Sequence, residues 1–330
     1  MESADQEVLR AACRWLSQGR PVALITVAAT WGSSPRPPGS LLAVRDDGRT
    51  AGSVSGGCVE ADLCERVAGG EFTGARPRVV TYGGPEAGAR FGLPCGGTLE
   101  LVLEPLADAA SLEPVLAAVD NRELIRRRLS LSGGQVTWGP AARDEPGLTW
   151  DGGHLEKVFG PTWRLLLIGA VQVSRFVARM ALALDYQVVV CDPRAEYADA
   201  WDLPGTTVDR RMPDDAVIDT ADDPRSAVVA LAHDPKLDDL GLMEALGSRA
   251  FYVGALGSQA NNDRRRVRLA SVGVAPGHLA RLHGPVGLPI GGHTPAEIAV
   301  AVVAELTAER HGRTLGRLDA APAVPAAMGA

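Results

Sequence analysis

Two cysteines of the first hundred residues lie in glycine-rich loops. Cys58 stands in the segment 52–60 (GSVSGGCVE), directly before a helix predicted over 59–68. Free N–H groups at a helix N-terminus lower the pKa of a thiol and attract anions. The segment therefore indicates a reactive thiolate or an anion cradle at Gly56, Gly57 and Cys58. The alternative is a small buried apolar residue, which is the commoner role of a lone cysteine.

Cys95 stands in a second such loop, 91–97 (FGLPCGG), beside Gly96 and without a clear following helix. It can meet Cys58 as a thiol pair, or the two can be separate structural cysteines, and both interpretations stay open. A third loop, 30–40 (TWGSSPRPPGS), carries Arg36. Three glycine-rich loops in so short a segment indicate function, because a purely structural domain rarely spends so much backbone entropy on loops.

The composition limits the function classes. The chain has 330 residues and a net charge of -7, which disfavours a general nucleic-acid binder. Its start is polar and acidic, and no apolar run approaches the roughly 20 residues of a membrane span. The five cysteines form no CxxC pair, and histidines and cysteines are too scattered for a zinc site. We therefore expect a cytoplasmic protein with free thiols, of which Cys13, Cys64 and Cys191 belong to the core.

The C-terminal half has a different pattern. Segment 164–168 (RLLLI) predicts a buried strand, 171–184 a helix, and 187–191 (QVVVC) a second strand. Together they form a βαβ unit of about thirty residues. Further strands at 227–232 and 250–253 alternate with helices. This alternation predicts a Rossmann-like, doubly wound parallel sheet.

The turn after the first of these strands has an incomplete glycine fingerprint. Of the three glycine positions, only Gly169 fits, since Val171 and Ser174 occupy the other two. Asp192 ends the second strand, where an acidic residue would meet a ribose hydroxyl. The turn is either an altered dinucleotide site or part of a scaffold that binds no such ligand, and both interpretations stay open.

Polar residues also follow the later strands. His233 comes after strand 227–232, as a base, a cofactor contact or a structural cap. Gly254, Gly257 and Ser258 follow strand 250–253, where backbone amides can hold a phosphate. The arginine run 264–266 is expected to form a solvated helix face. Before the last helix, the sequence predicts a capping box of Thr294 and Glu297, with Pro295 at the first helical position.

These elements predict an α/β chain with an N-terminal α+β domain and a C-terminal Rossmann-like domain. The expected boundaries are 1–130 for the first domain, 131–162 for a turn-rich linker or hairpin region, 163–312 for the second domain and 313–330 for a disordered tail.

The motifs in this order resemble the XdhC/CoxI family of xanthine dehydrogenase accessory proteins. The resemblance covers about 22–306. It is carried by seven segments: 32–36 (GSSPR), 52–60, 93–97 (LPCGG), 191–194 (CDPR), 233–234 (HD), 254–258 (GALGS) and 287–291 (GLPIG).

The resemblance implies an accessory chaperone, not an enzyme with turnover of its own. Such a protein binds the molybdenum cofactor and delivers it to an apo molybdenum hydroxylase of the xanthine dehydrogenase or aldehyde/CO dehydrogenase type. A cysteine desulfurase-type sulfur donor and a homodimer are further expected partners. Cys58 and Cys95 would contact the cofactor, including its molybdenum, since thiolates are soft ligands, and Arg36 would meet phosphate.

The Rossmann domain would then bind a dinucleotide form of the pterin or a nicotinamide nucleotide, through Gly169 and Asp192, as the second wall of the cofactor site. Val171 departs from the family pattern, which has glycine there, and this weakens the case for pyrophosphate binding. Two rivals remain. One is an NAD(P)-dependent oxidoreductase, and the other is a scaffold that docks two proteins.

Overall fold

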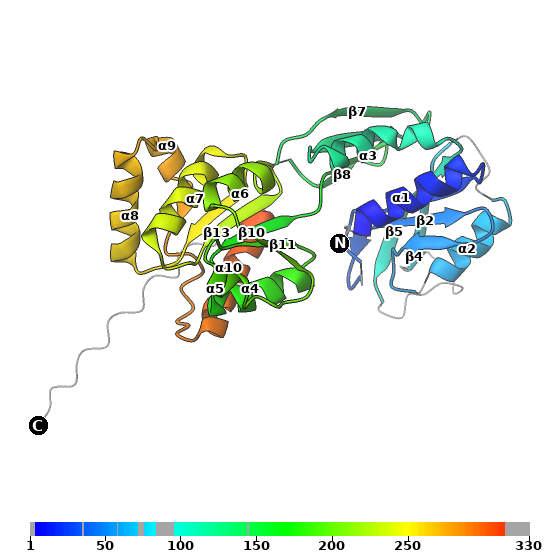
Figure 1. Cartoon of the computed structure of the whole chain (residues 1–330). Helices are drawn as coiled ribbons and strands as arrows, with labels where there is room; N and C mark the ends of the chain where they lie inside the picture. The colour runs from blue at the N-terminus through cyan, green and yellow to red at the C-terminus, as the bar shows by residue number, and fades with distance from the viewer. Residues whose placement is uncertain are drawn as a thin grey trace, which may run out of the picture. The chain divides into compact units, whose positions relative to one another are not determined.

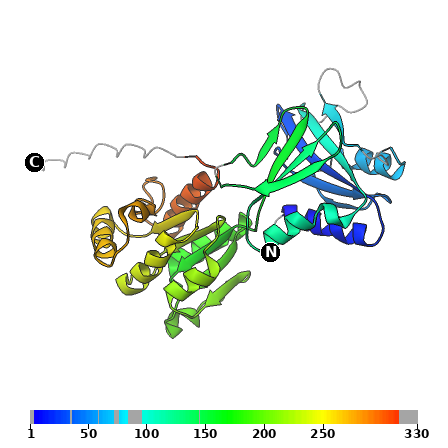
Figure 2. The same ribbon diagram turned by 90° about the horizontal axis from the view of Figure 1, so that it is seen from above.

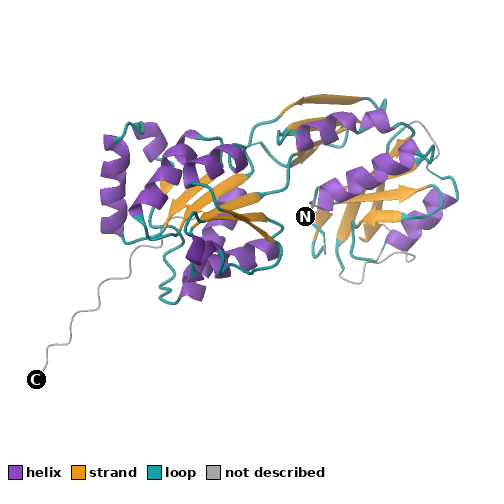
Figure 3. Ribbon diagram, in the orientation of Figure 1, coloured by secondary structure: helices purple, strands orange, loops and turns teal. Residues whose placement is uncertain are grey.

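The computed structural model describes residues 4–34, 36–57, 59–71, 76–83, 96–143 and 145–313. The chain divides into two compact units, Glu2–Pro161 and Thr162–Ala330. Figure 1 labels their helices and strands, and Figure 3 shows both units as mixtures of helix and sheet. No helix in the described ranges is long and apolar enough to cross a membrane.

The N-terminal unit holds two antiparallel sheets, of strand order β3-β2-β1-β5-β4 and β7-β6-β9-β8. Its elements are α1 (Ala4–Ser17), β1 (Val22–Trp31), β2 (Leu41–Arg45), β3 (Thr50–Gly52), α2 (Glu60–Ala68), β4 (Arg78–Gly83), β5 (Thr98–Leu106), the 3₁₀ helix η1 (Ala109–Ser111), α3 (Glu113–Asp120), β6 (Ile125–Ser130), β7 (Val136–Pro140), β8 (Leu148–Trp150) and β9 (His154–Phe159).

The five-stranded sheet is covered by helices on both faces. Successive side chains of a strand point to opposite faces, so β1 contributes residues to the hydrophobic clusters on both faces of the sheet. Ile25 packs with Leu63 of α2, whereas Leu24 packs with Leu9 of α1. Figure 2 shows α1 (dark blue) beside α3 (blue-green), whose Val115 belongs to the same cluster as Leu24.

The stretch 131–162, expected to be a linker or hairpin region, contains strands β7, β8 and β9. Strands β7 and β9 pair with β6, and β8 pairs with β9. Leu129 of β6 and Leu155 of β9 pack against Ala28 and Val102 of the five-stranded sheet. The stretch is therefore a second sheet of the N-terminal unit, and the change of unit comes at Thr162.

The C-terminal unit is a six-stranded parallel sheet of order β12-β11-β10-β13-β14-β15. Its elements are β10 (Arg164–Ile168), α4 (Gln172–Ala183), β11 (Gln187–Cys191), α5 (Ala195–Ala198), β12 (Thr206–Asp209), α6 (Pro213–Thr220), β13 (Ser226–Ala230), α7 (Pro235–Gly247), β14 (Tyr252–Ala255), α8 (Gln259–Ser271), α9 (Pro276–Leu279), β15 (Leu282–His283) and α10 (Pro295–Arg310).

Helices cover both faces of this sheet. Leu165 and Leu167 of β10 pack with α4 and α10, and Leu166 and Ile168 pack with α6 and α7. The strand order reverses between β10 and β13, which is where ligands bind in such sheets. The predicted fold, a doubly wound parallel sheet after an α+β unit, is confirmed. The predicted capping box of Thr294 and Glu297 is also present at α10.

Candidate functional site

The glycine-rich loops of the N-terminal unit lie at one end of its five-stranded sheet. Trp31, the last residue of β1, pairs with Thr98, the first residue of β5. The end of β3 pairs with the start of β2, through Gly52 and Leu42, and β2 runs antiparallel to β1. The loops after β1, after β3 and before β5 therefore begin at the same end of the sheet.

Two of these loops touch through their backbones. A Cβ atom on Gly97 would lie 2.1 Å from the carbonyl oxygen of Ser33, and one on Gly32 would lie 3.3 Å from the Cα of Gly97. Only glycine permits this approach. The exposed Arg36 belongs to the first loop, and its carbonyl accepts a hydrogen bond of 2.9 Å from Ser34 Oγ. Gly96 is exposed in the other loop, and Cys95 lies outside the described residues.

The loop before α2 closes around the carboxylate of Glu60. Its Oε1 accepts hydrogen bonds from Ser53 Oγ at 2.7 Å, from the Val54 amide at 3.0 Å and from the Ser55 amide at 2.9 Å. Its Oε2 accepts from Ser55 Oγ, and from the Gly57 amide at 2.9 Å.

The same serines also bind the rest of the loop. Ser53 Oγ accepts from the Gly56 amide, and Ser55 Oγ accepts from the Val59 amide, each at 3.0 Å. Residues 53–57, 59 and 60 thus form one hydrogen-bond network. Cys58 lies outside the described residues.

This network decides which donors remain for a ligand. Burial alone would raise the pKa of Glu60, but hydrogen bonds from Ser55 and Ser53 lower it to about 2. Glu60 is therefore an anion, and it already takes the amides of Val54, Ser55 and Gly57. An external anion would have to compete with it for these amides.

The three described cysteines are free thiols, and two of them have raised pKa values. Burial and the nearby Glu60 raise the pKa of Cys64. Burial, with Asp209 and Asp192 adding to it, raises the pKa of Cys191 to about 12. Cys64 and Cys191 are therefore protonated at neutral pH and poor nucleophiles or ligands. No group of three or more His, Cys, Asp or Glu side chains in the described ranges could hold a metal ion.

In the C-terminal unit, Gly169 makes the turn at the switch point. Its φ is +103°, and its amide donates to the Cys191 carbonyl at 2.8 Å. A Cβ atom there would lie 2.6 Å from the Cα of Ala232, at the end of β13. Ser174 stands at the third fingerprint position and is fully buried, and its hydroxyl donates to the Gly169 carbonyl at 2.6 Å. Helix α4 begins after Val171 without a side-chain cap from the described residues.

Asp192 is fully buried, and its carboxylate is bound within the protein. It accepts from the Ala170 amide at 2.8 Å, and from Arg194 Nε at 2.9 Å and Nη2 at 2.8 Å. Burial would raise the pKa of Asp192, but the bonds from Arg194 and Ala170 lower it. The Arg194 guanidinium also lies over the ring of Tyr197, 3.9 Å from its centroid. A ribose hydroxyl would therefore meet Arg194 first, and the role expected of Asp192 stays a prediction.

The remaining predicted residues lie along the same edge of the sheet. His233 is exposed after β13, with a φ of +57°. Gly254 lies inside β14 and is buried. The Gly257 carbonyl accepts from the side-chain amide of Asn262 at 3.1 Å. Ser258 caps α8 by accepting from the Asn261 amide at 3.3 Å, which is a structural use of its hydroxyl.

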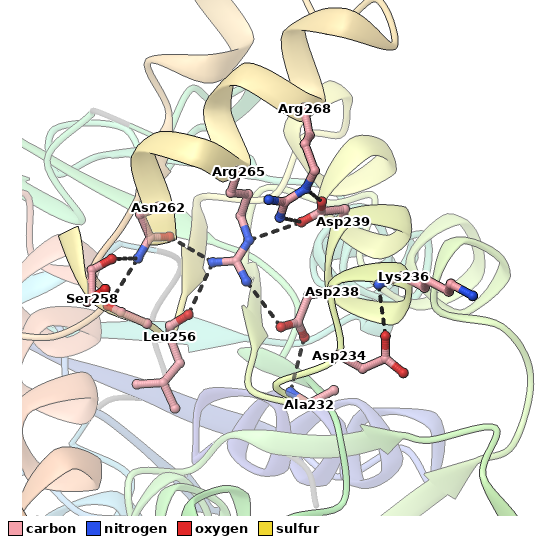
Figure 4. A network of polar contacts seen from close by, with 11 residues as sticks. Ala232, Asp234, Lys236, Asp238, Asp239, Leu256, Ser258, Asn262, Arg265 and Arg268 are labelled. Carbon is pink, nitrogen blue, oxygen red and sulfur yellow. Dashed lines mark hydrogen bonds and ion pairs between the residues drawn. The ribbon is translucent and has the colours of Figure 1, made fainter. Parts of the chain in front are cut away.

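The expectation of a solvated arginine face on α8 is wrong for Arg265, which is only 6% exposed. Figure 4 shows its guanidinium between α7 and α8. It donates to Asp238 Oδ2 and Asp239 Oδ1 at 3.1 Å each, and to the Leu256 carbonyl at 3.1 Å. Asp238 in turn accepts from the Ala232 amide at 3.1 Å. Arg265 therefore ties the ends of β13 and β14 together.

Sequence reasoning missed Glu60, Arg194 and Arg265 as residues that shape the loops. Glu60 stands within the segment 52–60, and three possible donors at 53, 55 and 57 precede it. The spacing of two residues from Asp192 to Arg194 could also have predicted a local ion pair. No local signal marked Arg265, because its carboxylate partners stand on another helix.

Family models match both units. The model described as the XdhC Rossmann domain matches residues 165–306, and the model of the XdhC and CoxI family matches residues 15–83. The chain belongs to the XdhC and CoxI family.

Two curated proteins and a solved structure are similar to this chain over nearly its whole length. The molybdenum cofactor insertion chaperone PaoD of Escherichia coli is 29% identical over 92% of this chain and 88% of its own. A Bacillus subtilis protein described as a probable subunit of xanthine dehydrogenase is 26% identical over 87% and 92% of the two chains. The crystal structure of a Bacillus halodurans protein described as a xanthine dehydrogenase has a TM-score of 0.67 and 25% identity, over 94% of this chain and 97% of that one.

Proposed function

We propose that this chain binds the molybdenum cofactor and delivers it to an apo molybdenum hydroxylase, of the xanthine dehydrogenase or aldehyde/CO dehydrogenase type. The family and the named relative, a molybdenum cofactor insertion chaperone, support a role in the maturation of a molybdenum enzyme. A cysteine desulfurase-type sulfur donor, a homodimer and a cytoplasmic location belong to the same proposal.

The observation that carries the proposal is the gathering of three glycine-rich loops at one end of the N-terminal sheet. Cys58 and Cys95 are the proposed contacts of the cofactor, and of its molybdenum. Thiolates suit a metal-dithiolene group because both are soft. The other cysteines fit this role less well, since burial raises the pKa of Cys64 and Cys191.

The loop conformation supports the same assignment. Glu60 holds the Gly57 amide and Ser55 Oγ holds the Val59 amide, so the residues on both sides of Cys58 have a defined course. A preorganised loop loses less conformational entropy when it binds a ligand. We propose Gly56, Gly57 and Gly96 as backbone contacts and Arg36 as the phosphate contact, because Arg36 is exposed in the loop that touches Gly97.

For the C-terminal unit, we propose a nucleotide at the switch point between β10 and β13. The uncapped start of α4 offers N–H groups to a phosphate. Gly169, Asp192 and His233 would line this site, with Asp192 acting through Arg194. The proposed contacts continue on β14 with Gly254, and on the loop after β14 with Gly257 and Ser258. The dinucleotide form of the pterin is the proposed occupant.

The small molecules that co-purify with the full-length protein test the proposal. The protein is purified from two matched strains, one that makes molybdopterin and one that does not, and the small molecules are identified by mass spectrometry. We expect a pterin phosphate or pterin dinucleotide in the first preparation alone. A preparation that carries no pterin, and binds none at micromolar concentration, would overturn the proposal.

A further inference from the structure

A carboxylate, a phenol and an imidazole meet at the edge strand β15, away from the switch point between β10 and β13. Glu305 of α10 accepts hydrogen bonds at its Oε2 from Tyr252 Oη at 2.5 Å and from the Gly287 amide at 2.6 Å. Its Oε1 lies 3.0 Å from Nδ1 of His283. The rings of Tyr252 and His283 lie against each other, with their centroids 4.4 Å apart.

The contacts of Glu305 determine which nitrogen of His283 carries a proton. Burial would raise the pKa of Glu305, but the hydrogen bonds from His283, Tyr252 and Gly287 lower it. An ionised carboxylate can only accept hydrogen bonds. Nδ1 of His283 is therefore the donor in this pair, and Nε2 is a hydrogen-bond acceptor whenever it carries no proton.

His283 borders a cavity of about 710 Å³, within the usual range for small-molecule sites. Its side chain is 28% exposed, so a ligand can reach it. Apolar side chains line the cavity, among them Leu256, Leu288 and Ile298, and Gln259 adds an amide.

Hydrogen-bond donors border the same cavity. Arg266 lines it and uses Nη2 to bind the carbonyls of Leu282 at 3.1 Å and Gly284 at 3.2 Å, which flank His283 in the chain. Its Nη1 lies 3.7 Å from the exposed carboxylate of Asp263, and neither Nη1 nor Nε makes a hydrogen bond with any residue in the described ranges. The cavity therefore brings together the ring of His283, hydrogen-bond donors and apolar walls.

We propose that this cavity binds a planar heterocycle by its lactam edge, an N–H beside a carbonyl. The ligand N–H donates to Nε2 of His283, and its carbonyl accepts from Arg266 or Gln259. The apolar walls favour a ring system over a small hydrated amide, because apolar burial supplies much of the binding free energy. Nucleobases and pterins both have such an edge. The inference goes beyond the proposed delivery of cofactor and does not depend on it.

The test titrates the full-length protein by calorimetry with hypoxanthine and with pterin. Each is compared with its analogue methylated on the lactam nitrogen, which lacks the donor. We expect at least one parent compound to bind at micromolar concentration, and its methylated analogue to bind at least tenfold more weakly. Binding of hypoxanthine alone assigns a nucleobase, and binding of pterin alone assigns a pterin.

Two variants test the geometry. His283→Ala should weaken binding at least tenfold, whereas His278→Ala, at an exposed histidine of α9, should not change it. Glu305→Gln places an amide N–H opposite Nδ1 of His283 and so moves the ring proton to Nε2. This variant should lose the preference for the unmethylated ligand, and the imidazole ¹⁵N NMR signals should report the changed tautomer. Thermal melting confirms that each variant is folded.

Three results would overturn the inference: neither parent compound binds, the methylated analogues bind equally well, or His283→Ala binds like the wild type. Failure here is distinguishable from failure of the proposed function, because the proposed function is also read from hydroxylase maturation, which these titrations do not measure.

Discussion

Charged residues hold loops at strand ends in both units, but in opposite ways. In the N-terminal unit, the anion Glu60 gathers amides and hydroxyls from one contiguous segment, 53–57. In the C-terminal unit, the buried cation Arg265 gathers Asp238, Asp239 and a strand-end carbonyl from separate elements (Figure 4). The first network is local, so we expect it to open without disturbing its unit, whereas the second joins separate elements of the tertiary fold. This difference fits a loop that exchanges a ligand and a sheet that stays rigid.

The largest expected effect is that of Arg265→Ala. It leaves Asp238, which is 1% exposed, without its cationic partner. Removing one member of a buried ion pair costs about 3–5 kcal/mol. Burial already raises the pKa of Asp238 to about 6. At about pH 5 this carboxyl is mostly protonated and needs no cationic partner, so the loss of unfolding free energy should be smaller there than at about pH 8. Urea unfolding at both pH values measures it.

Arg264→Ala is the matched control, since Arg264 is exposed one position earlier on α8. It should change the free energy of unfolding by less than about 0.5 kcal/mol. Equal effects of the two substitutions would show that the Arg265 network does not hold the strand ends together.

Gly169→Ala tests the tight turn at the switch point. The added Cβ atom would meet the backbone of Ala232 at 2.6 Å, at a φ of +103°. Gly273 has a similar φ of +98° but open space around it, so Gly273→Ala measures the conformational strain alone. We expect about 1 kcal/mol for Gly273→Ala and about 3 kcal/mol for Gly169→Ala. Equal losses in thermal unfolding would mean that the contact with Ala232 is unimportant.

Glu60→Gln tests the local network. The amide nitrogen cannot accept from Ser55 Oγ or Gly57 N, so the loop should lose about 2 kcal/mol of local stability. Hydrogen exchange at Val54, Ser55 and Gly57 should accelerate by about thirtyfold, while exchange in β1 stays unchanged. Faster exchange throughout the unit would contradict the view that this network is local.

The same carboxylate gives a pH dependence with a defined sign. Its folded pKa of about 2 lies below the ordinary value of 4.5. As the pH falls, the opened loop takes up the proton first. The stabilisation present above about pH 4.5 should therefore disappear between about pH 4.5 and 2. The acid sensitivity of exchange in this loop should be absent from Glu60→Gln.

The smallest effect is expected for Ser258→Ala at the start of α8. Losing the cap on the Asn261 amide should cost about 1 kcal/mol. If Ser258 acts only as a cap, nucleotide binding stays as in the wild type. A tenfold loss of binding with unchanged stability would instead make the hydroxyl a ligand contact.

Much of the C-terminal fold could be predicted from its continuous apolar strands, such as 164–168 and 187–191. The edge strands escaped prediction. β12 (TTVD) is only partly buried, and β15 has two residues, too few for any periodicity. The second N-terminal sheet was predicted only as a linker or hairpin region, because its strands are short and separated by glycine-rich turns.

A candidate loop could be picked out where a single segment forms it, as in 52–60, and its role as the functional site stays a prediction. Contacts were not predictable where partners come from distant segments. The burial of Arg265 depends on two aspartates of α7, and the pair of His283 and Glu305 joins residues that stand 22 positions apart.

The central proposal is that Cys58 contacts the cofactor that this chain delivers to a hydroxylase. The most direct measurement is reconstitution of an apo molybdenum hydroxylase with cofactor-loaded protein, comparing the wild type, Cys58→Ala and Cys13→Ala, with hydroxylase activity as the readout. We predict that Cys58→Ala reduces the recovered activity at least tenfold, while Cys13→Ala, at a thiol of α1, matches the wild type. Full recovery with Cys58→Ala would contradict the claim.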